Sequence, residues 1–139
     1  MNKKNDCFLL KIAPFFIFPA GVFLFDLFLI YFKVYDVLPN LDIPMHFIGG
    51  LSIAYMSALF LIYFNDKNLI KIRNDFLFVF VVVSVVSFIA VLWEFFEFSL
   101  KVFFNLPFQP CLDDTLMDLL MGILGGFFGG AIFKFLYKL

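Results

Sequence analysis

The sequence predicts an all-α polytopic membrane protein, a bundle of four transmembrane helices. Hydrophobic residues make up 64% of the 139-residue chain and charged residues only 15%, whereas soluble domains carry about 25% charged residues. The chain also contains 25 Phe, 5 Tyr and 1 Trp, and a soluble domain of this length buries only about 70% of its unfolded surface. A soluble globule is therefore excluded, and lipid is expected to cover the remaining apolar side chains.

Four apolar runs are long enough to cross the hydrocarbon core, which takes about 20 residues. The polar segments between them leave no room for a soluble domain, so residues 1–139 are expected to form a single membrane domain. Lys3 and Lys4 precede the first run as in a signal peptide, but the run is too long and no small-residue cleavage site follows, so we interpret it as a retained helix. The predicted spans are residues 8–32, 43–64, 76–100 and 115–136.

Positive charges lie mostly on one side of the predicted spans. Eight Lys and Arg residues fall at the ends that include both termini, and two fall at the opposite ends. Cytoplasmic loops carry the excess of positive charge, so both termini are predicted to be cytoplasmic and the protein is expected in the cell (cytoplasmic or inner) membrane. The eight are Lys3, Lys4, Lys11, Lys67, Lys71, Arg73, Lys134 and Lys138, and the two are Lys33 and Lys101.

Composition also limits the binding partners. Ten Lys and Arg against eleven Asp and Glu give a net charge of -1, which provides no basic surface for nucleic acid. Cys7 and Cys111 are far apart and belong to no Cys/His cluster, so no zinc knuckle or disulfide framework is expected and both are interpreted as free thiols. Membrane lipids are the expected partners, and DNA and RNA are excluded.

Several ionisable residues lie inside the predicted spans, where each costs about 2.5 to 3.5 kcal/mol at a helix centre and indicates a functional site. His46 and Asp118 lie about one helical turn from the outer ends of the second and fourth spans. Glu94 and Glu97 lie near the outer end of the third span, and Asp26 lies about 9 Å below the outer end of the first. Four helices therefore place an acid or an imidazole at one membrane level.

Helical periodicity of about 100° per residue predicts that these side chains face one another. Each of the last three spans carries one polar stripe, whereas positions beside the third stripe, such as Trp93, are expected to face lipid. The stripes predict a polar pocket that opens toward the outer side. They are Asp42, His46, Gly49, Ile53 and Ser57 in the second span, Ser87, Glu94, Glu97 and Lys101 in the third, and Asp114, Asp118, Gly122, Gly125 and Gly129 in the fourth.

The fourth span is also rich in glycine. Small residues at positions i and i+4 let helix backbones approach closely in a membrane. This pattern predicts a tightly packed central helix, and a homo-oligomer interface is the alternative. The glycines are Gly122, Gly125, Gly126, Gly129 and Gly130.

Structural roles are the alternative for several polar residues. Asp42 and Asp113 stand where helix N-caps are expected, and Lys101 lies one turn beyond Glu97, a spacing that suits an ion pair. A single histidine is more typical of packing than of ligand binding, but His46 shares its membrane level with at least four acids. A functional role for His46 is therefore the favoured interpretation.

Clustered carboxylates in a low dielectric cannot all stay charged without compensation. Glu94, Glu97, Asp114 and Asp118, with His46, are therefore candidate contacts for a polar lipid headgroup or candidate ligands of a divalent metal, for which Mg, Mn and Zn are all chemically admissible. A metal at this level could activate water or hold a phosphate at the outer leaflet. Protonated or Lys-paired acids that hydrogen-bond between helices are the alternative.

The ordered motifs resemble the YjdF-like family of small bacterial and archaeal membrane proteins, over roughly Asp42 to Gly130, which leaves the first span outside the match. More distantly they resemble VanZ-like proteins. The VanZ-like pattern has Glu-x-x-Gln where this chain has Glu94-x-x-Glu97, and Asn where it has Gly122, so a role in glycopeptide-antibiotic tolerance is not implied. The YjdF-like resemblance supports the choice of residues and implies no particular reaction. Its motifs are Asp42-x-x-x-His46 with Gly49-Gly50, Trp93-Glu94-x-x-Glu97, and Asp114-Thr115-x-x-Asp118 with Gly125 and Gly129.

The sequence thus predicts a membrane protein whose acidic pocket binds a cation or a polar lipid headgroup. As an enzyme it would carry out metal-assisted hydrolysis or transfer on a phospholipid or a cell-envelope lipid carrier, with the acids as ligands and His46 as general base. A structural protein with a carboxylate network between its helices is one alternative. The other is a proton- or ion-coupled transporter, which would need a homo-oligomer and in which Asp26, the deepest acid, would take part.

Overall fold

Four long helices make up most of the protein, and all four are long and apolar enough to cross a membrane. The computed structural model describes residues 3–104 and 111–137, with side chains from residue 12 onward. Lys138 and residues 105–110 of the last predicted loop lie outside the described residues. The all-α, four-span prediction is confirmed. The elements are α1 (Lys3–Tyr31), α2 (Val34–Val37), the 3-10 turn η1 (Pro39–Leu41), α3 (Asp42–Asp66), α4 (Asp75–Phe104) and α5 (Leu112–Leu136).

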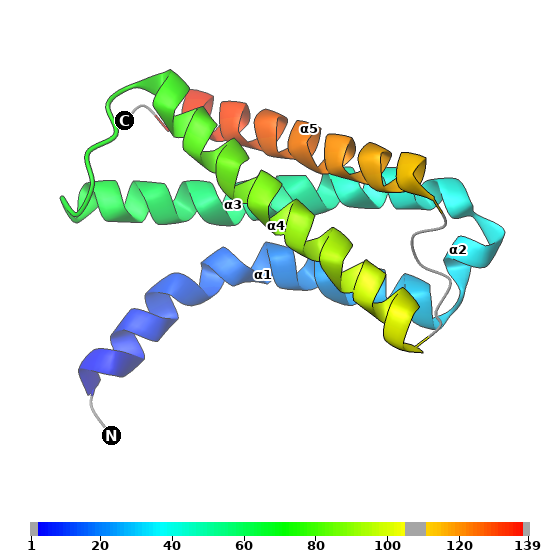
Figure 1. Cartoon of the computed structure of the whole chain (residues 1–139). Coiled ribbons are helices and arrows are strands. Elements are labelled where there is room, and N and C mark those ends of the chain that lie inside the picture. Colours follow the sequence, from blue (N-terminus) through cyan, green and yellow to red (C-terminus); the bar gives the residue numbers. More distant parts are fainter. Residues whose placement is uncertain (1–2, 105–110, 138–139) are drawn as a thin grey trace.

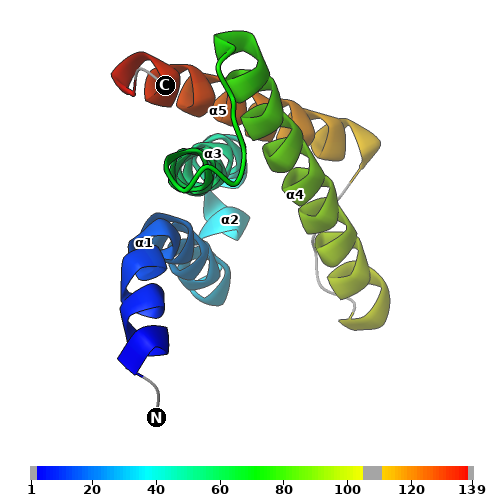
Figure 2. The same cartoon turned by 90° about the vertical axis from the view of Figure 1, so that its left-hand side faces the viewer.

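α3 lies at the centre of the bundle. It packs against α1, α4 and α5, and α5 also packs against α4. Figure 2 shows α3 with the other three long helices around it. The N-terminal end of α1 and the C-terminal end of α5 lie at the same end of the bundle, and α2 lies at the opposite end (Figure 1). These two helix ends therefore share one end of the bundle, and the assignment of that end to the cytoplasm stays a prediction.

α1 bends within its first half (Figure 1). Pro14 and Pro19 lie inside this helix, and a proline in a helix interior removes a backbone hydrogen bond and clashes with the preceding turn. Edge-to-face ring contacts hold α1 on α3, among them that of Phe15 with Phe60, whose ring centroids are 5.1 Å apart. The bent helix is therefore attached to the bundle mainly by aromatic packing.

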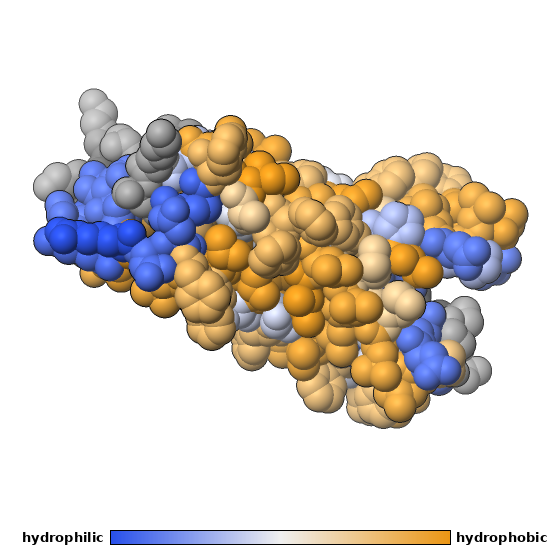
Figure 3. Space-filling model, turned by 90° about the horizontal axis from the view of Figure 1, so that it is seen from above, coloured by the Kyte–Doolittle hydropathy of each residue, from blue (hydrophilic) through white to orange (hydrophobic). Residues whose placement is uncertain are grey.

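The surface of the bundle is apolar along its middle. Figure 3 shows one face of the bundle, with hydrophobic residues over most of it and hydrophilic residues gathered toward the two ends. Large side chains such as Phe80, Phe88 and Phe95 on α4 are more than half exposed. This distribution is typical of a protein whose middle faces lipid and whose ends face water.

Glycines bring α5 into close contact with α3. A Cβ atom on Gly50 would overlap the backbone of Gly122, and one on Gly125 would overlap a backbone carbonyl of α3. About one turn further, a Cβ atom on Gly129 would come within 2.6 Å of the Ala54 Cβ. Small residues allow such an approach, so the separation of α3 and α5 depends on these positions.

The same helix presents a second glycine face to α4. A Cβ atom on Gly126 would come within 2.8 Å of Val86, and one on Gly130 within 3.2 Å of Val82. The glycine-rich surface is thus occupied by α3 and α4 of the same chain, and a second copy of the chain would have to contact another surface. The buried apolar cluster beside it consists of Ala54, Ala58, Ile72, Phe78, Val82 and Val86.

The prediction that Asp42 and Asp113 cap their helices is wrong. The N-cap residues are Leu41 and Cys111, and neither cap position carries a side-chain hydrogen bond. The turn η1 runs directly into α3, so Leu41 already has helical backbone angles, φ -70° and ψ -20°. Asp42 therefore lies inside the first turn of α3, where the helix dipole favours a negative charge, and its side chain faces His46.

Candidate functional site

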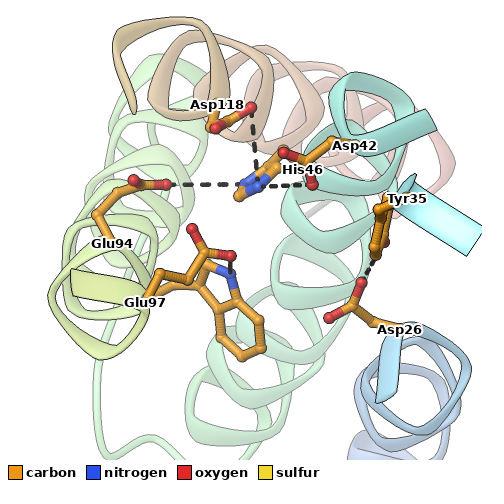
Figure 4. Close-up of polar contacts among 8 residues, drawn as sticks. Asp26, Tyr35, Asp42, His46, Glu94, Glu97 and Asp118 are labelled. Atoms are coloured by element: carbon orange, nitrogen blue, oxygen red, sulfur yellow. Dashed lines mark hydrogen bonds and ion pairs between the residues drawn. The ribbon is translucent and has the colours of Figure 1, made fainter. Parts of the chain in front are cut away.

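His46 lies at the centre of a group of carboxylates from three helices (Figure 4). Its side chain is 11% exposed. The Nε2 atom is 3.5 Å from Oδ1 of Asp42 on the same helix and 3.8 Å from Oδ1 of Asp118 on α5. The Nδ1 atom is 4.0 Å from Oε1 of Glu94 on α4. Each ring nitrogen therefore faces at least one acid, and the acids come from α3, α4 and α5.

Helix periodicity and the glycine contact together assemble this group. Asp42 and His46 lie one turn apart on α3, at the spacing that brings side chains onto one face. Gly50 lies one turn beyond His46, and Gly122 lies one turn beyond Asp118 on α5. Because the two glycines are in contact and both helices run away from the α2 end, the preceding turns bring His46 and Asp118 together.

Two of the carboxylates are buried, Asp118 at 1% exposure and Glu94 at 6%. The Oδ2 atom of Asp118 has no hydrogen-bond partner within the described part of the chain. Breaking the pairing of a buried charge typically costs 3 to 5 kcal/mol, and buried polar atoms in folded proteins nearly always have a partner, an ordered water or an ion. Asp118 therefore needs a proton or a cation that its neighbours do not supply in full.

Trp93 orients Glu97, and its placement corrects the prediction that it faces lipid. The indole Nε1 donates a hydrogen bond of 2.8 Å to Oε1 of Glu97, one turn further along α4. The ring of Phe23 on α1 lies edge-on to the Trp93 ring, with centroids 5.9 Å apart. Trp93 is therefore half-buried between α4 and α1, because its N–H has a carboxylate partner and its ring has an aromatic one.

Asp26 on α1 is held by a residue that follows the first span. The hydroxyl of Tyr35, in α2, donates a hydrogen bond to Oδ1 of Asp26. Burial, and then the adjacent Asp26 carboxylate, raise the pKa of Tyr35 well above its ordinary value. Tyr35 thus stays protonated at neutral pH and keeps its donor directed at Asp26.

A cavity of about 440 Å³ lies beside the histidine cluster, between α1, α3 and α4. Its charged lining groups are near the α2 end, and the rest of its lining is mostly apolar. The volume falls within the range of small-molecule sites, roughly 300 to 1,000 Å³. The lining spans Phe16 to Asp26 on α1, Asp42 to Ile53 on α3 and Val86 to Glu97 on α4, with Gly122 of α5.

Two sets of side chains have donor atoms close enough to share a metal ion. The first set is Asp42, His46 and Asp118, and the second is His46, Glu94 and Glu97. Within each set the donor atoms lie within 4.8 Å of one another. His46 belongs to both sets, so the two sets form one connected cluster.

The structure places the predicted site residues unequally. Asp114 lies one turn before Asp118, is only partly buried and belongs to neither donor set, and Lys101 is exposed. Ser87 donates to the Val83 carbonyl of its own helix and does not line the cavity. Of the predicted stripe on α4, only Glu94 and Glu97, near the C-terminal end of the helix, take part in the cluster or line the cavity.

The sequence did not identify three contacts in and beside this cluster. Asp42 was placed in the same polar stripe as His46 but was interpreted as a cap and not as a ligand candidate, although its spacing from His46 was a signal for a direct contact. Trp93 lies one turn before Glu97, and this spacing was a signal that the indole N–H could donate a hydrogen bond to the carboxylate. Tyr35 gave no signal, because its contact with Asp26 depends on how the chain turns after α1.

The comparison with protein families covers nearly the whole chain. Residues 7–138 match the family described as "Predicted membrane protein (DUF2238)". The chain belongs to the DUF2238 family. This membership supports an integral membrane protein, while the finer relation to YjdF-like and VanZ-like proteins stays a prediction. No curated protein and no solved structure matches the chain, and the DUF2238 description names no activity, so the function has to be argued from the site.

Proposed function

We propose that the cluster around His46 binds a divalent metal ion, with Nε2 of His46 and the carboxylates of Asp42 and Asp118 as ligands. The observation that carries this proposal is the buried Oδ2 atom of Asp118, which has no hydrogen-bond partner in the described part of the chain. An acidic cluster alone would not indicate a ligand. A buried carboxylate oxygen that has no hydrogen-bond partner and lies beside an imidazole nitrogen is stabilised by a bound cation.

The distances in the cluster suit metal ligands better than hydrogen bonds. The Nε2 atom of His46 is 3.5 Å from Asp42 and 3.8 Å from Asp118, whereas charge-assisted hydrogen bonds are about 2.7 to 2.9 Å long. Two ligands that are each about 2.1 Å from one tetrahedral metal lie roughly 3.4 Å apart. A modest inward shift of Asp118 would therefore complete the ligand set.

Glu94 suits the role of a positioning residue. It faces Nδ1 of His46, the nitrogen that the proposed metal does not use. Histidine ligands commonly donate their second N–H to a carboxylate, which fixes the ring and makes the metal-bound nitrogen more basic. Glu94 would orient His46 in this way.

The donor set favours zinc or manganese over magnesium. Imidazole nitrogen with carboxylate oxygens suits Zn²⁺ and Mn²⁺, whereas Mg²⁺ is usually held by oxygen ligands and keeps several waters. Three protein ligands leave a coordination position open, as in catalytic zinc sites. Metal-assisted chemistry on a membrane lipid or a cell-envelope lipid carrier, with a neighbouring acid such as Glu97 in a proton-transfer role, is the enzymatic form of this proposal.

We further propose that the cluster faces the outer half of the membrane. Of the described basic side chains, Lys67, Lys71, Arg73 and Lys134 lie toward the end that carries the termini, and Lys33 and Lys101 lie toward the cluster. The positive-inside rule then puts the termini in the cytoplasm of the cell and the cluster toward the opposite side.

Metal binding can be measured on the full chain purified in a non-ionic detergent. The protein is stripped with a chelator, dialysed and titrated with ZnCl₂ or MnCl₂ by calorimetry, and elemental analysis of untreated protein gives the bound ion. We expect one metal per chain for the wild type and a loss of at least about tenfold in affinity for Asp118→Asn, because this variant loses a charged ligand. Asp113→Asn, an exposed acid on the same helix, is the matched control and should bind as the wild type does.

Failure of the wild type to bind either metal saturably would overturn the proposal. Binding by Asp118→Asn at wild-type affinity would also overturn it, since the buried acid would then not be a ligand. Either result would favour the structural alternative, in which protonated carboxylates join the helices, or an ion-coupled transporter. If variants with an amide in place of a cluster carboxylate unfold as the wild type does, both with and without chelator, the result would support the structural alternative specifically.

A further inference from the structure

The cavity beside the cluster has the depth of one membrane leaflet. Its lining covers ten or eleven residue steps on α1, α3 and α4, which is about 15 to 17 Å at 1.5 Å per residue. Half of a hydrocarbon core of about 30 Å is about 15 Å. The cavity therefore extends from the level of the polar cluster to about the middle of the bilayer.

Its lining changes character along this length. Away from the cluster, the walls are mostly aromatic, aliphatic or glycine residues, such as Phe16, Pro19 and Ala20 on α1 and Val86 and Ile89 on α4. Ser52 also lines this part, and its hydroxyl donates a hydrogen bond to the Gly49 carbonyl of its own helix. Water in such a space would find few hydrogen-bond partners. An alkyl chain is the chemistry that fits this part of the cavity.

The end of the cavity next to the cluster is lined by charged side chains and suits a charged head group. The charged residues that line it are Asp26, Asp42 and Glu97, joined by His46, and none of the described lining residues is Lys or Arg. With Asp42 and His46 as ligands of the proposed metal, the carboxylates of Asp26 and Glu97 remain at this end. They would repel a phosphate or sulfate head and attract an amine or ammonium group.

Asp26 and Glu97 are well placed to hold a cation between them. They come from helices on opposite sides of the cavity, and each is oriented by a hydrogen bond, from Tyr35 to Asp26 and from Trp93 to Glu97. The rings of Trp93 and Phe23 also line this end, and aromatic faces attract ligand cations.

We infer that the cavity binds an amphiphile from the surrounding bilayer, with a cationic amine head at Asp26 and Glu97 and a single alkyl chain along α1, α3 and α4. This inference goes beyond the proposed metal site. Asp118, the buried ligand on which the metal proposal depends, does not line the cavity. Asp26, at the head position, belongs to neither donor set. His46 and Asp42 belong to the metal site and also line the polar end of the cavity, so the two sites adjoin. Asp118 and Asp26 each belong to one site alone, and substitutions at these two residues test the sites separately.

The single tryptophan of the sequence reports on occupancy, because Trp93 lines the cavity. The probe is a 12-carbon alkyltrimethylammonium with bromine atoms on its chain, which quench indole fluorescence on contact, and the comparison is the alkyl sulfate with the same brominated chain. Both are titrated at low mole fraction into the full-length protein in a neutral detergent. We expect saturable quenching by the ammonium and only linear, non-saturating quenching by the sulfate.

Two variants test the two ends of the cavity. Asp26→Asn should weaken ammonium binding by about tenfold through loss of a charge-assisted contact, and it should bind metal as the wild type does. Gly49→Leu places an alkyl side chain in the cavity at a position where an added Cβ atom would have open space, and it should abolish saturable quenching. Asp118→Asn should lose metal and keep ammonium binding.

Equal saturable quenching by the ammonium and the sulfate would overturn the inference, because the head would then contribute no charge recognition. Saturable quenching at the wild-type level in both Asp26→Asn and Gly49→Leu would also overturn the inference. Loss of ammonium binding in Asp118→Asn together with wild-type binding in Asp26→Asn would also overturn it, since the amphiphile would then be held through the metal site. Absence of metal in the wild type with ammonium binding intact would contradict only the proposed metal site.

Discussion

Replacing Gly50 with alanine should both destabilise the bundle and weaken the metal site. The new Cβ atom would overlap the backbone of Gly122, which cannot move aside as a flexible side chain can. Overpacking typically costs 1 to 3 kcal/mol, and a clash with backbone should lie near the upper value, about 3 kcal/mol. Alanine is favoured over glycine in a helix by about 1 kcal/mol, so the expected net loss is about 2 kcal/mol.

Gly49→Ala is a matched control one residue away. It carries the same helix-propensity gain, but its Cβ atom would have no neighbour within 4 Å. The difference between the two variants removes the propensity term and should therefore be about 3 kcal/mol, the steric cost alone. Unfolding in an SDS titration, followed by the fluorescence of Trp93, gives both free energies.

The same clash should separate His46 from Asp118. Relief of the overlap pushes α3 and α5 apart one turn from these side chains, so their separation should increase beyond 3.8 Å. Metal affinity of Gly50→Ala should then fall while that of Gly49→Ala stays at the wild-type value. Equal unfolding free energies for the two alanine variants would refute the packing argument, and a destabilised Gly50→Ala with unchanged metal affinity would refute its link to the site.

Two further predictions concern the α2 end of the protein. Because the pKa of Tyr35 is raised on folding, its contribution to stability should be complete below about pH 10, the ordinary tyrosine value, and should decline as the pH rises further toward the folded-state value. The difference in unfolding free energy between wild type and Tyr35→Phe should thus shrink above about pH 10, and a constant difference up to pH 11 would contradict the Asp26 contact. In a Cys7→Ser background, exposed Cys111 should react with a membrane-impermeant maleimide from outside intact cells or spheroplasts. Labelling only after permeabilisation would reverse the proposed orientation.

Most of the fold could be predicted from the sequence because a lipid environment imposes strong constraints. A spanning helix must satisfy its own backbone and expose apolar side chains, so length and hydropathy identify all four long helices. Their ends could not be placed as well. The turn η1 joins α3 without a break, so the capping rule failed at Asp42, where the preceding residue is itself helical.

The sequence predicted the level of each site residue along its helix, but only partly the direction in which its side chain points. His46, Glu94 and Asp118 lie at one level and share a centre, as the outer-end positions of their spans indicated. The direction of a side chain also depends on how far a helix is rotated and tilted against its neighbours. Trp93 was assigned to lipid because a sequence cannot show that α1 would bring the ring of Phe23 against it.

The cluster is a local conflict between the charges of its side chains and their burial. Three helices place carboxylates around one imidazole, and glycine packing brings Asp118 so close to α3 that the acid is almost fully buried. Lys33 and Lys101, which lie toward the same end of the bundle, have exposed side chains. Conflicts of this kind between local chemistry and a well-packed fold are expected at functional sites. Within the described residues, the Oδ2 atom of Asp118 is buried without a hydrogen-bond partner. A proton or a cation would compensate it, and the experiments on Asp118 and Asp26 distinguish binding of a metal from binding of an amine.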